Sequence, residues 1–247
     1  MPELKWKTTQ LQTPEGAVKV THWAKHDPTH LIEAINNGTL VESDHPKVFR
    51  SHLGRYKIAI RNFEYKRSRF SEHPLDLFAA LRDLADRRVA IVEMPVAMVE
   101  KGNEATLVTL WKDESTPFHH FIRDDKISFE KKRLACLKMV REVAKLHANG
   151  YTHGHLKLDN FLVDKNYNPK LIDFTKMRRV DPELACAELG IYSQGGDFFH
   201  YLSDRLHNFA EFVAPEDNAI AYQAFKQLLE SEYQKYYDLH IAKNADK

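Results

Sequence analysis

The stretch of sequence that decides the fold is Leu146–Val163, LHANGYTHGHLKLDNFLV, together with Lys170–Lys176, KLIDFTK. A helix is predicted just before it, over 129–148, because apolar residues recur there at helical spacing and Asn149-Gly150 is a helix stop. Short strand patterns lie within both parts of the stretch and flank a polar turn. This order of elements predicts that the polar side chains of the stretch converge on one place.

Several of these side chains suit the chemistry of a phosphate group and a hard cation. Asn160 and Asp173 offer amide and carboxylate oxygens, which are the ligands that Mg²⁺ prefers. Lys157 offers a positive charge that can neutralise a phosphate.

The order of these residues resembles the protein-kinase catalytic loop, H-R-D-x-x-x-x-N, and the D-F-G segment that follows it. His153 stands at the first position, and Gly154 stands where the arginine is found. His155 replaces the aspartate that acts as catalytic base, and Thr175 replaces the glycine of D-F-G. The His-Gly pair and the basic run Lys176–Arg179 resemble the atypical branch that includes the bacterial lipopolysaccharide core kinases, which act on Kdo and heptose.

The resemblance, which covers residues 47–205, implies a kinase that uses ATP and Mg²⁺. It implies that Asn160 and Asp173 are the metal ligands and that Lys157 neutralises charge on the transferring phosphate. The γ-phosphate of ATP would then go to a sugar hydroxyl of the lipopolysaccharide core or to another hydroxyl acceptor. Arg61, in Ile58-Ala-Ile-Arg61, stands at the position of the lysine that binds the nucleotide phosphates, and Gly54 is the nearby glycine able to approach a nucleotide. Trp111 lies at the expected junction of the two lobes, where adenine would contact the backbone.

Some assignments stay open at this point. The other candidates for the phosphate ligand are Lys57 and Lys66, and the candidates for its acidic partner are Glu72, Asp76 and Asp83. Asp197 lies near the position at which kinases place a buried aspartate that holds the catalytic loop.

The histidine at position 155 leaves two classes of function open. With an ordinary pKa of about 6.5, a neutral imidazole can accept the hydroxyl proton, so His155 and Lys157 are the candidate catalytic residues of an active kinase. In the other class the aspartate has been lost, and the chain is a catalytically impaired pseudokinase that acts as a binding or regulatory module. A small-molecule phosphotransferase of the aminoglycoside or choline type fits less well, because its H-x-D-x-x-x-x-N loop needs the same aspartate.

Strand patterns come first along the chain and helical patterns come later, which predicts an α+β protein with a two-lobed kinase-like fold. We expect an N-terminal extension over 1–40, a small β-rich N-lobe over 41–111 and a helical C-lobe over 112–247. Residues 1–30 are polar and are expected to be extended or loop. Within the N-lobe the expected elements are strands at 47–50 and 56–63, a helix at 75–88 and a hairpin at 90–111.

Composition limits the partners. A hydrophobic fraction of 43% supports a packed core, and a formal net charge of +1 gives no bulk attraction to nucleic acid, so no nucleic-acid partner is expected. Cys136 and Cys186 form no disulfide framework and no apolar stretch reaches spanning length, so we expect a cytoplasmic protein. The expected substrate bears a hydroxyl group and is a lipid-linked sugar or a protein. A lipid-linked sugar would bring the chain to the inner membrane face as a peripheral protein.

Overall fold

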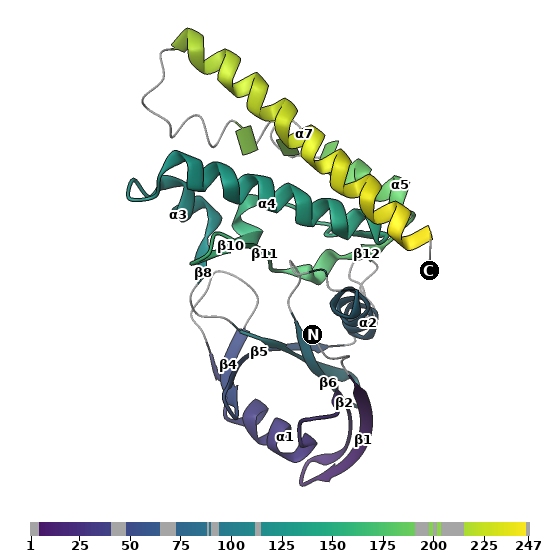
Figure 1. Ribbon diagram of the computed structural model, residues 1–247. Coiled ribbons are helices and arrows are strands. Elements are labelled where there is room, and N and C mark those ends of the chain that lie inside the picture. Colours follow the sequence, from purple (N-terminus) through teal and green to yellow (C-terminus); the bar gives the residue numbers. More distant parts are fainter. Residues whose placement is uncertain are drawn as a thin grey trace. The chain divides into compact units, whose positions relative to one another are not determined.

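The computed structural model describes residues 5–40, 48–64, 73–87, 89, 94–111, 115–190, 198–199, 202–203 and 215–245 (Figure 1). The chain divides into two compact units. The first comprises Met1–Arg88 and Glu93–Asp113, and the second comprises Val89–Val92 and Glu114–Lys247. Strands dominate the first unit and helices dominate the second, so the α+β class expected for a two-lobed kinase-like fold is confirmed.

The first unit is built on a seven-stranded antiparallel sheet with the order β1-β2-β6-β7-β5-β4-β3. Its strands are β1 (Trp6–Thr13), β2 (Gly16–Trp23), β3 (Thr39–Leu40), β4 (Val48–Leu53), β5 (Tyr56–Glu64), β6 (Pro95–Lys101) and β7 (Glu104–Leu110). Helix α1 (Pro28–Asn36) connects β2 to β3, and helix α2 (Pro74–Asp86) lies between β5 and β6 in the sequence. Figure 1 shows the sheet curving around α1.

A hydrophobic core joins α1 to this sheet. Leu31 of α1 is buried together with Val20 of β2 and Ile58 of β5. On β5, the residues from Ile58 to Ile60 are buried in succession, which indicates that both faces of this central strand are covered. Helix α2 packs against β6 and β7. The position of Arg61 is thus set by a buried strand in the middle of the sheet.

The expectation that residues 1–30 form a loop or an extension is wrong at β1 and β2. These two strands pair in continuous register along their whole length, and β2 also pairs with β6. Val18 and Val20 are buried whereas their neighbours Ala17 and Lys19 are exposed. Because the exposed face of an antiparallel sheet carries polar residues, the polar composition of this hairpin concealed its strands. The first 40 residues belong to the same compact unit as β4 and β5.

The other elements predicted for this unit are confirmed with small changes of bounds. β4 and β5 form a hairpin, and so do β6 and β7. Helix α2 begins at Pro74, where the fixed φ of proline suits the first turn of a helix. The first positions of the strand expected from residue 90, residues 90–93, lie outside the described residues.

The second unit combines helices with two small antiparallel sheets. Its helices are α3 (Phe118–Arg123), α4 (Phe129–Ala148), α5 (Pro182–Ala185) and α7 (Pro215–Ala245), with short 3-10 turns at η1 (Leu158–Asn160), η2 (Phe174–Lys176) and η3 (Cys186–Gly190). One sheet has the order β11-β10-β8 and the other consists of β12 and β9. The strands are β8 (Ser115–Pro117), β9 (Tyr151–Thr152), β10 (Phe161–Asp164), β11 (Pro169–Leu171) and β12 (Arg178–Arg179).

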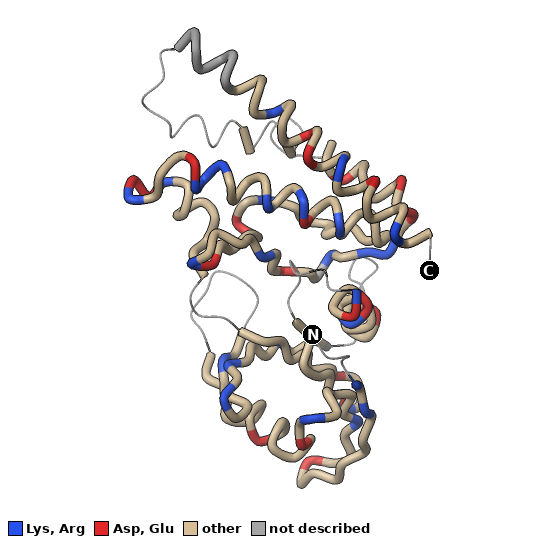
Figure 2. Tube along the Cα trace, in the orientation of Figure 1, with Lys and Arg blue, Asp and Glu red and all other residues tan. Residues whose placement is uncertain are grey.

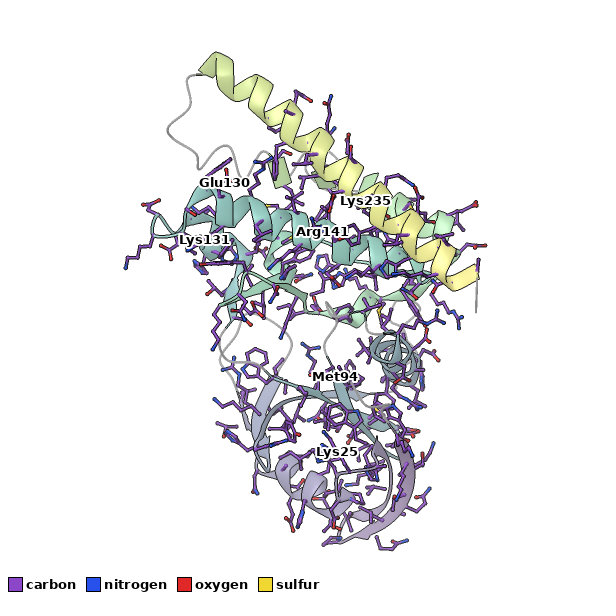
Figure 3. The ribbon with its side chains drawn as sticks, viewed as in Figure 1. Lys25, Met94, Glu130, Lys131, Arg141 and Lys235 are labelled. Carbon is purple, nitrogen blue, oxygen red and sulfur yellow. The ribbon has the colours of Figure 1, made fainter. Side chains whose placement is uncertain are left out.

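Helix α4 is the predicted helix over 129–148, and it is the central element of this unit. Its buried face runs through Ala135, Met139 and Val143, which recur every fourth residue on one side of the helix. Figure 1 shows α7 lying alongside α4, and Figure 2 shows that basic and acidic residues both occur along the two helices. Arg141, labelled between the two helices in Figure 3, forms an ion pair with Glu232 of α7.

None of the helices within the described ranges is both long enough and apolar enough to cross a membrane.

Candidate functional site

Two segments of the second unit face each other across the candidate site. The first segment, 153–160, runs from β9 to β10, and the second segment, 172–177, runs from β11 to β12. Because β9 pairs with β12 and β10 pairs with β11, the two segments are tied together at both ends. The backbone N–H of Ile172 also donates to the carbonyl of Asn160 at 2.9 Å. The topology therefore holds side by side the two parts of the chain that the sequence singled out.

Asn160 is completely buried at the end of η1, and its amide has a fixed orientation. Its Nδ2 donates to the backbone carbonyl of His155 at 2.8 Å. Its Oδ1 is buried and has no hydrogen-bond partner among the described residues. A buried amide oxygen without a partner is costly unless something binds it, so this oxygen is the feature of the site that most needs a ligand.

Asp173 adopts a left-handed backbone conformation, with φ of 62° and ψ of 57°. Residues other than glycine seldom adopt this conformation, although aspartate tolerates it better than most. Its side chain is 19% exposed, and Oδ2 lies 3.7 Å from Nδ1 of His155. The turn at Asp173 thus places its carboxylate on the side that faces the first segment, 153–160.

His153 connects the two segments by a side chain that is completely buried. Its Nε2 donates to the carbonyl of Ile172 at 3.0 Å, and its ring lies 4.9 Å from the ring of Phe174, edge to face. Burial lowers the pKa of His153, so the imidazole is neutral at neutral pH. His153 therefore braces the segment that carries Asp173, and it is not placed as a metal ligand.

Gly154 is required by the close approach of the two segments. Its φ is +75°, and a Cβ at this position would lie 2.1 Å from the backbone oxygen of Lys176. No side chain fits at that distance. The glycine that stands in place of the kinase arginine is therefore a consequence of how tightly this loop packs.

Glu188 of η3 holds the start of the first segment, 153–160, in place, and the sequence analysis did not single it out. Its Oε2 accepts the backbone N–H of His153 at 2.8 Å, and its Oε1 accepts that of Gly154 at 2.6 Å. Burial raises the pKa of Glu188, but hydrogen bonds from His147 and the His153 backbone outweigh it, and the net direction is down. Asp197, the candidate for this role, lies outside the described residues. No local pattern marks Glu188, because only tertiary contacts distinguish it from Glu183 in the same stretch.

His155 lies at the exposed edge of the site, with 38% of its side chain accessible. Burial lowers its pKa, and the charges of Lys157 and Lys176 lower it further, against the opposing effect of Asp173. The 3.7 Å between His155 Nδ1 and Asp173 Oδ2 is longer than a hydrogen bond, whose length is about 2.7–3.2 Å. The imidazole is therefore unprotonated at neutral pH and free to accept a proton.

Lys157, the other expected catalytic residue, lies near Asp159, with 3.8 Å between its Nζ and Asp159 Oδ2.

The residues expected to bind the nucleotide phosphates belong to the first unit, and the structure separates two of them. Arg61 lies on β5 opposite Val48 of β4. Gly54 lies in the turn before β5, at the other end of that strand, where its φ of +57° suits a two-residue hairpin turn. The five strand steps from Tyr56 to Arg61 span about 17 Å. Gly54 thus forms the tip of the hairpin of β4 and β5, and its expected approach to a nucleotide stays a prediction.

Trp111 follows β7 and is fixed by two contacts within the first unit. Its backbone N–H donates to the carbonyl of Lys57 at 2.8 Å, and the guanidinium of Arg50 lies 4.1 Å from its ring centroid. Among the acidic candidates, Asp83 accepts a hydrogen bond from Arg87 at 2.8 Å. Lys66 and Glu72 lie outside the described residues.

No protein-family model matches the chain. Parts of it are similar to curated protein kinases. It is 32% identical over 77 residues to the maternal embryonic leucine zipper kinase of Xenopus tropicalis, covering 31% of this chain and 12% of the relative. It is 30% identical over 91 residues to the serine/threonine-protein kinase ROP17 of Toxoplasma gondii, covering 37% of this chain and 15% of the relative. The chain is kinase-like.

The same kinase of Danio rerio gives a similar match, 39% identical over 57 residues, which is 23% of this chain and 8% of the relative. The kinase-like chain thus spans only a small part of the length of the relatives that it matches. None of these three relatives is named as a sugar or lipopolysaccharide kinase.

Proposed function

We propose that the chain binds ATP together with Mg²⁺ and transfers the γ-phosphate to a hydroxyl group. The observation that carries this proposal is the buried, unpartnered Oδ1 of Asn160, which lies in the segment facing Asp173. An amide oxygen and a carboxylate at these positions fit the metal-binding pair of a protein kinase. The similarity to protein kinases supports ATP and Mg²⁺ as the cofactors.

The residues present fit a magnesium ion that is held jointly with a nucleotide. Among the described residues, no group of three or more His, Cys, Asp or Glu side chains is arranged to hold a metal by itself. Mg²⁺ is usually bound by one or two protein carboxylates plus waters and substrate phosphates, so a site of Asn160 and Asp173 needs phosphate oxygens to complete it. When bound, the ion would supply positive charge that neutralises the phosphates.

His155 and Lys157 are proposed as the catalytic residues of the second unit. As the acceptor oxygen bonds to the γ-phosphorus and the bond from phosphorus to the ADP oxygen breaks, the hydroxyl proton passes to the neutral imidazole of His155. Lys157 neutralises charge on the transferring phosphoryl group. The lowered pKa of His155 supports this role, because a base must be unprotonated before it accepts the proton.

An anionic acceptor suits the surroundings of this site. Lys176, Arg178 and Arg179 follow Asp173, and all three are exposed. Basic side chains beside the site attract an acceptor that itself carries negative charge. A phosphorylated sugar of the lipopolysaccharide core and an acidic segment of a protein both meet this requirement. The sugar is favoured by the resemblance of the loop, and the protein is favoured by the similarity to protein kinases.

A pseudokinase is the second candidate function. It is favoured by the histidine at position 155, which stands where the resembled kinase loop carries its catalytic aspartate. In this case the chain binds a partner or a nucleotide without phosphate transfer. Transfer of labelled phosphate from ATP to lipopolysaccharide core sugar, to an acidic protein, or to neither separates the three outcomes.

The experiment that tests nucleotide binding is thermal unfolding with ATP and Mg²⁺. A ligand that binds only the folded state stabilises it by about 2.7 kcal/mol at a concentration of 100 times Kd, so Tm should rise by several degrees. Asp173→Ala should remove the Mg²⁺-dependent part of the rise. Asp159→Ala, a change of the same charge in the exposed part of η1, is the matched control and should keep it. A well-folded wild type without any rise at millimolar nucleotide contradicts the proposal.

A further inference from the structure

Glu188 binds the backbone of the first segment, 153–160, and is itself hydrogen-bonded by His147 of α4. Nε2 of His147 lies 3.0 Å from Oε2 of Glu188. On its other side, Nδ1 of His147 lies 2.7 Å from the hydroxyl of Tyr233 of α7. His147 is 0% exposed and Tyr233 is 4% exposed. A buried chain of polar groups therefore runs from the last helix to the backbone of His153 and Gly154.

The acceptor capacity of the carboxylate fixes the direction of these hydrogen bonds. An ionised Glu188 only accepts, so Nε2 of His147 carries the proton that lies between them. In a neutral imidazole Nδ1 then has a lone pair, and the hydroxyl of Tyr233 donates to it. Sγ of Cys186, 3.3 Å away, is a second acceptor for the hydroxyl proton, but a ring nitrogen accepts more strongly than sulfur and Nδ1 is the nearer of the two. Tyr233 thus selects the imidazole tautomer that binds Glu188.

Tyr233 is well placed to keep this hydrogen bond, because packing fixes its ring. The ring meets that of Phe199 edge to face at 5.6 Å and stacks with that of Tyr237 at 6.0 Å. Burial raises the pKa of the Tyr233 phenol, so it stays protonated and remains a donor. Two further contacts dock α7 on α4 nearby: the ion pair of Glu232 with Arg141, and the hydrogen bond from Asn244 Nδ2 to the carbonyl of Ala148 at 3.0 Å.

We propose that α7 is a working part of the site, and that Tyr233 and His147 are positioning residues which act through Glu188. Docking of α7 orders His147, His147 orders Glu188, and Glu188 orders the backbone that places His155. Through the hydrogen bond from His153 to Ile172, the same order reaches Asp173. The effect on nucleotide binding rests on the proposed function, whereas the effect on the loop itself does not.

The test compares Tyr233→Phe with Tyr236→Phe. Both variants lose one hydroxyl from α7. The Tyr236 ring, however, packs near the cations of Arg141 and Lys145, and among the described residues its hydroxyl makes no hydrogen bond. The first readout is hydrogen exchange of the His153 and Gly154 amides, measured by NMR without nucleotide. Exchange should be about 10-fold faster in Tyr233→Phe, as expected for the loss of one buried hydrogen bond, and unchanged in Tyr236→Phe.

The second readout is the tautomer of His147, taken from the ¹⁵N shifts of its ring. Wild type should show the Nε2–H form, and Tyr233→Phe should show a mixture of tautomers. Glu188→Gln, which keeps the side-chain shape, should speed exchange of the same two amides by a similar factor or more. If Tyr233→Phe folds poorly, Glu188→Gln provides the test instead.

Unchanged amide exchange and an unchanged tautomer in folded Tyr233→Phe would overturn the inference, even if Tm fell. In that case Tyr233 would contribute to packing only and would not position the loop. With nucleotide present, Tyr233→Phe should also raise the Kd for ATP with Mg²⁺ by about 10-fold. If wild type binds no nucleotide while the two NMR readouts change as expected, the proposed function fails and the positioning role of α7 stands.

Discussion

In the resemblance of this loop to that of protein kinases, His155 stands at the position of the catalytic aspartate. The groups around His155 determine the protonation state of its ring. Burial and the charges of Lys157 and Lys176 favour the neutral imidazole. A protonated ring would instead pair with Asp173, whose Oδ2 is 3.7 Å away, and would compete with a cation for that carboxylate. The side chain is therefore suited to accept a proton and poorly suited to carry one.

The pH dependence of phosphotransfer tests this role. If the neutral form of His155 is the base, the rate should rise with pH through one apparent pKa below the ordinary value of about 6.5, because the site lowers that pKa. His155→Ala should flatten the profile and lower the plateau rate by about 10²–10⁴-fold. Initial rates at saturating ATP are the measurement. A profile of the same shape in His155→Ala would assign the titration to another group.

His155→Asp separates a working histidine from a lost aspartate. If the histidine works, this variant should be no faster than wild type. If the aspartate has simply been lost, the rate should rise by about 10²-fold or more, because a positioned carboxylate base has been restored. Both His155 variants keep Asn160 and Asp173, so the rise of Tm with ATP and Mg²⁺ is the internal control. A variant that loses this rise is not interpretable as a change of the base alone.

At the level of elements, the hairpin of β1 and β2 contributes to the core of the first unit. Val20 is completely buried in that core, whereas Gln10 on β1 is exposed. Val20→Ala should lower the free energy of unfolding by about 2 kcal/mol, because it removes buried methyl groups and leaves a cavity. Gln10→Ala should change it by less than about 0.5 kcal/mol. Urea unfolding measures both changes in the free energy of unfolding. Equally small changes in the two variants would mean that the hairpin does not contribute to the core.

The sequence was most informative where periodicity or spacing was strong. It predicted α4, the strands β4 and β5, the hairpin of β6 with β7, and the two segments that carry His155 and Asp173. It did not reveal β1 and β2, whose few buried residues are separated by polar ones. Gly54 was singled out as a glycine able to approach a nucleotide, and the structure places it at the tip of the hairpin of β4 and β5. Glu188 was missed because its partners lie 35 and 34 residues away along the chain.

At the level of the whole molecule, each compact unit has a core of its own. Val20 belongs to the core of the first unit, and Met139, also completely buried, belongs to that of the second. We expect Val20→Ala to speed amide exchange mainly within the first unit and Met139→Ala to speed it mainly within the second, because opening follows contiguous cooperative units. Exchange measured peptide by peptide, by mass spectrometry after proteolysis, is the test. Equal acceleration throughout the chain by either variant would show a single cooperative unit.

The glycine at position 154 also limits how this protein can be engineered. A Cβ there would lie 2.1 Å from the Lys176 backbone oxygen, on a residue whose φ is +75°. Replacing Gly154 alone by the arginine of the H-R-D motif would therefore distort the loop. A working transplant has to move 153–160 and 172–179 together as one cassette, since the shape of each half is defined by the other.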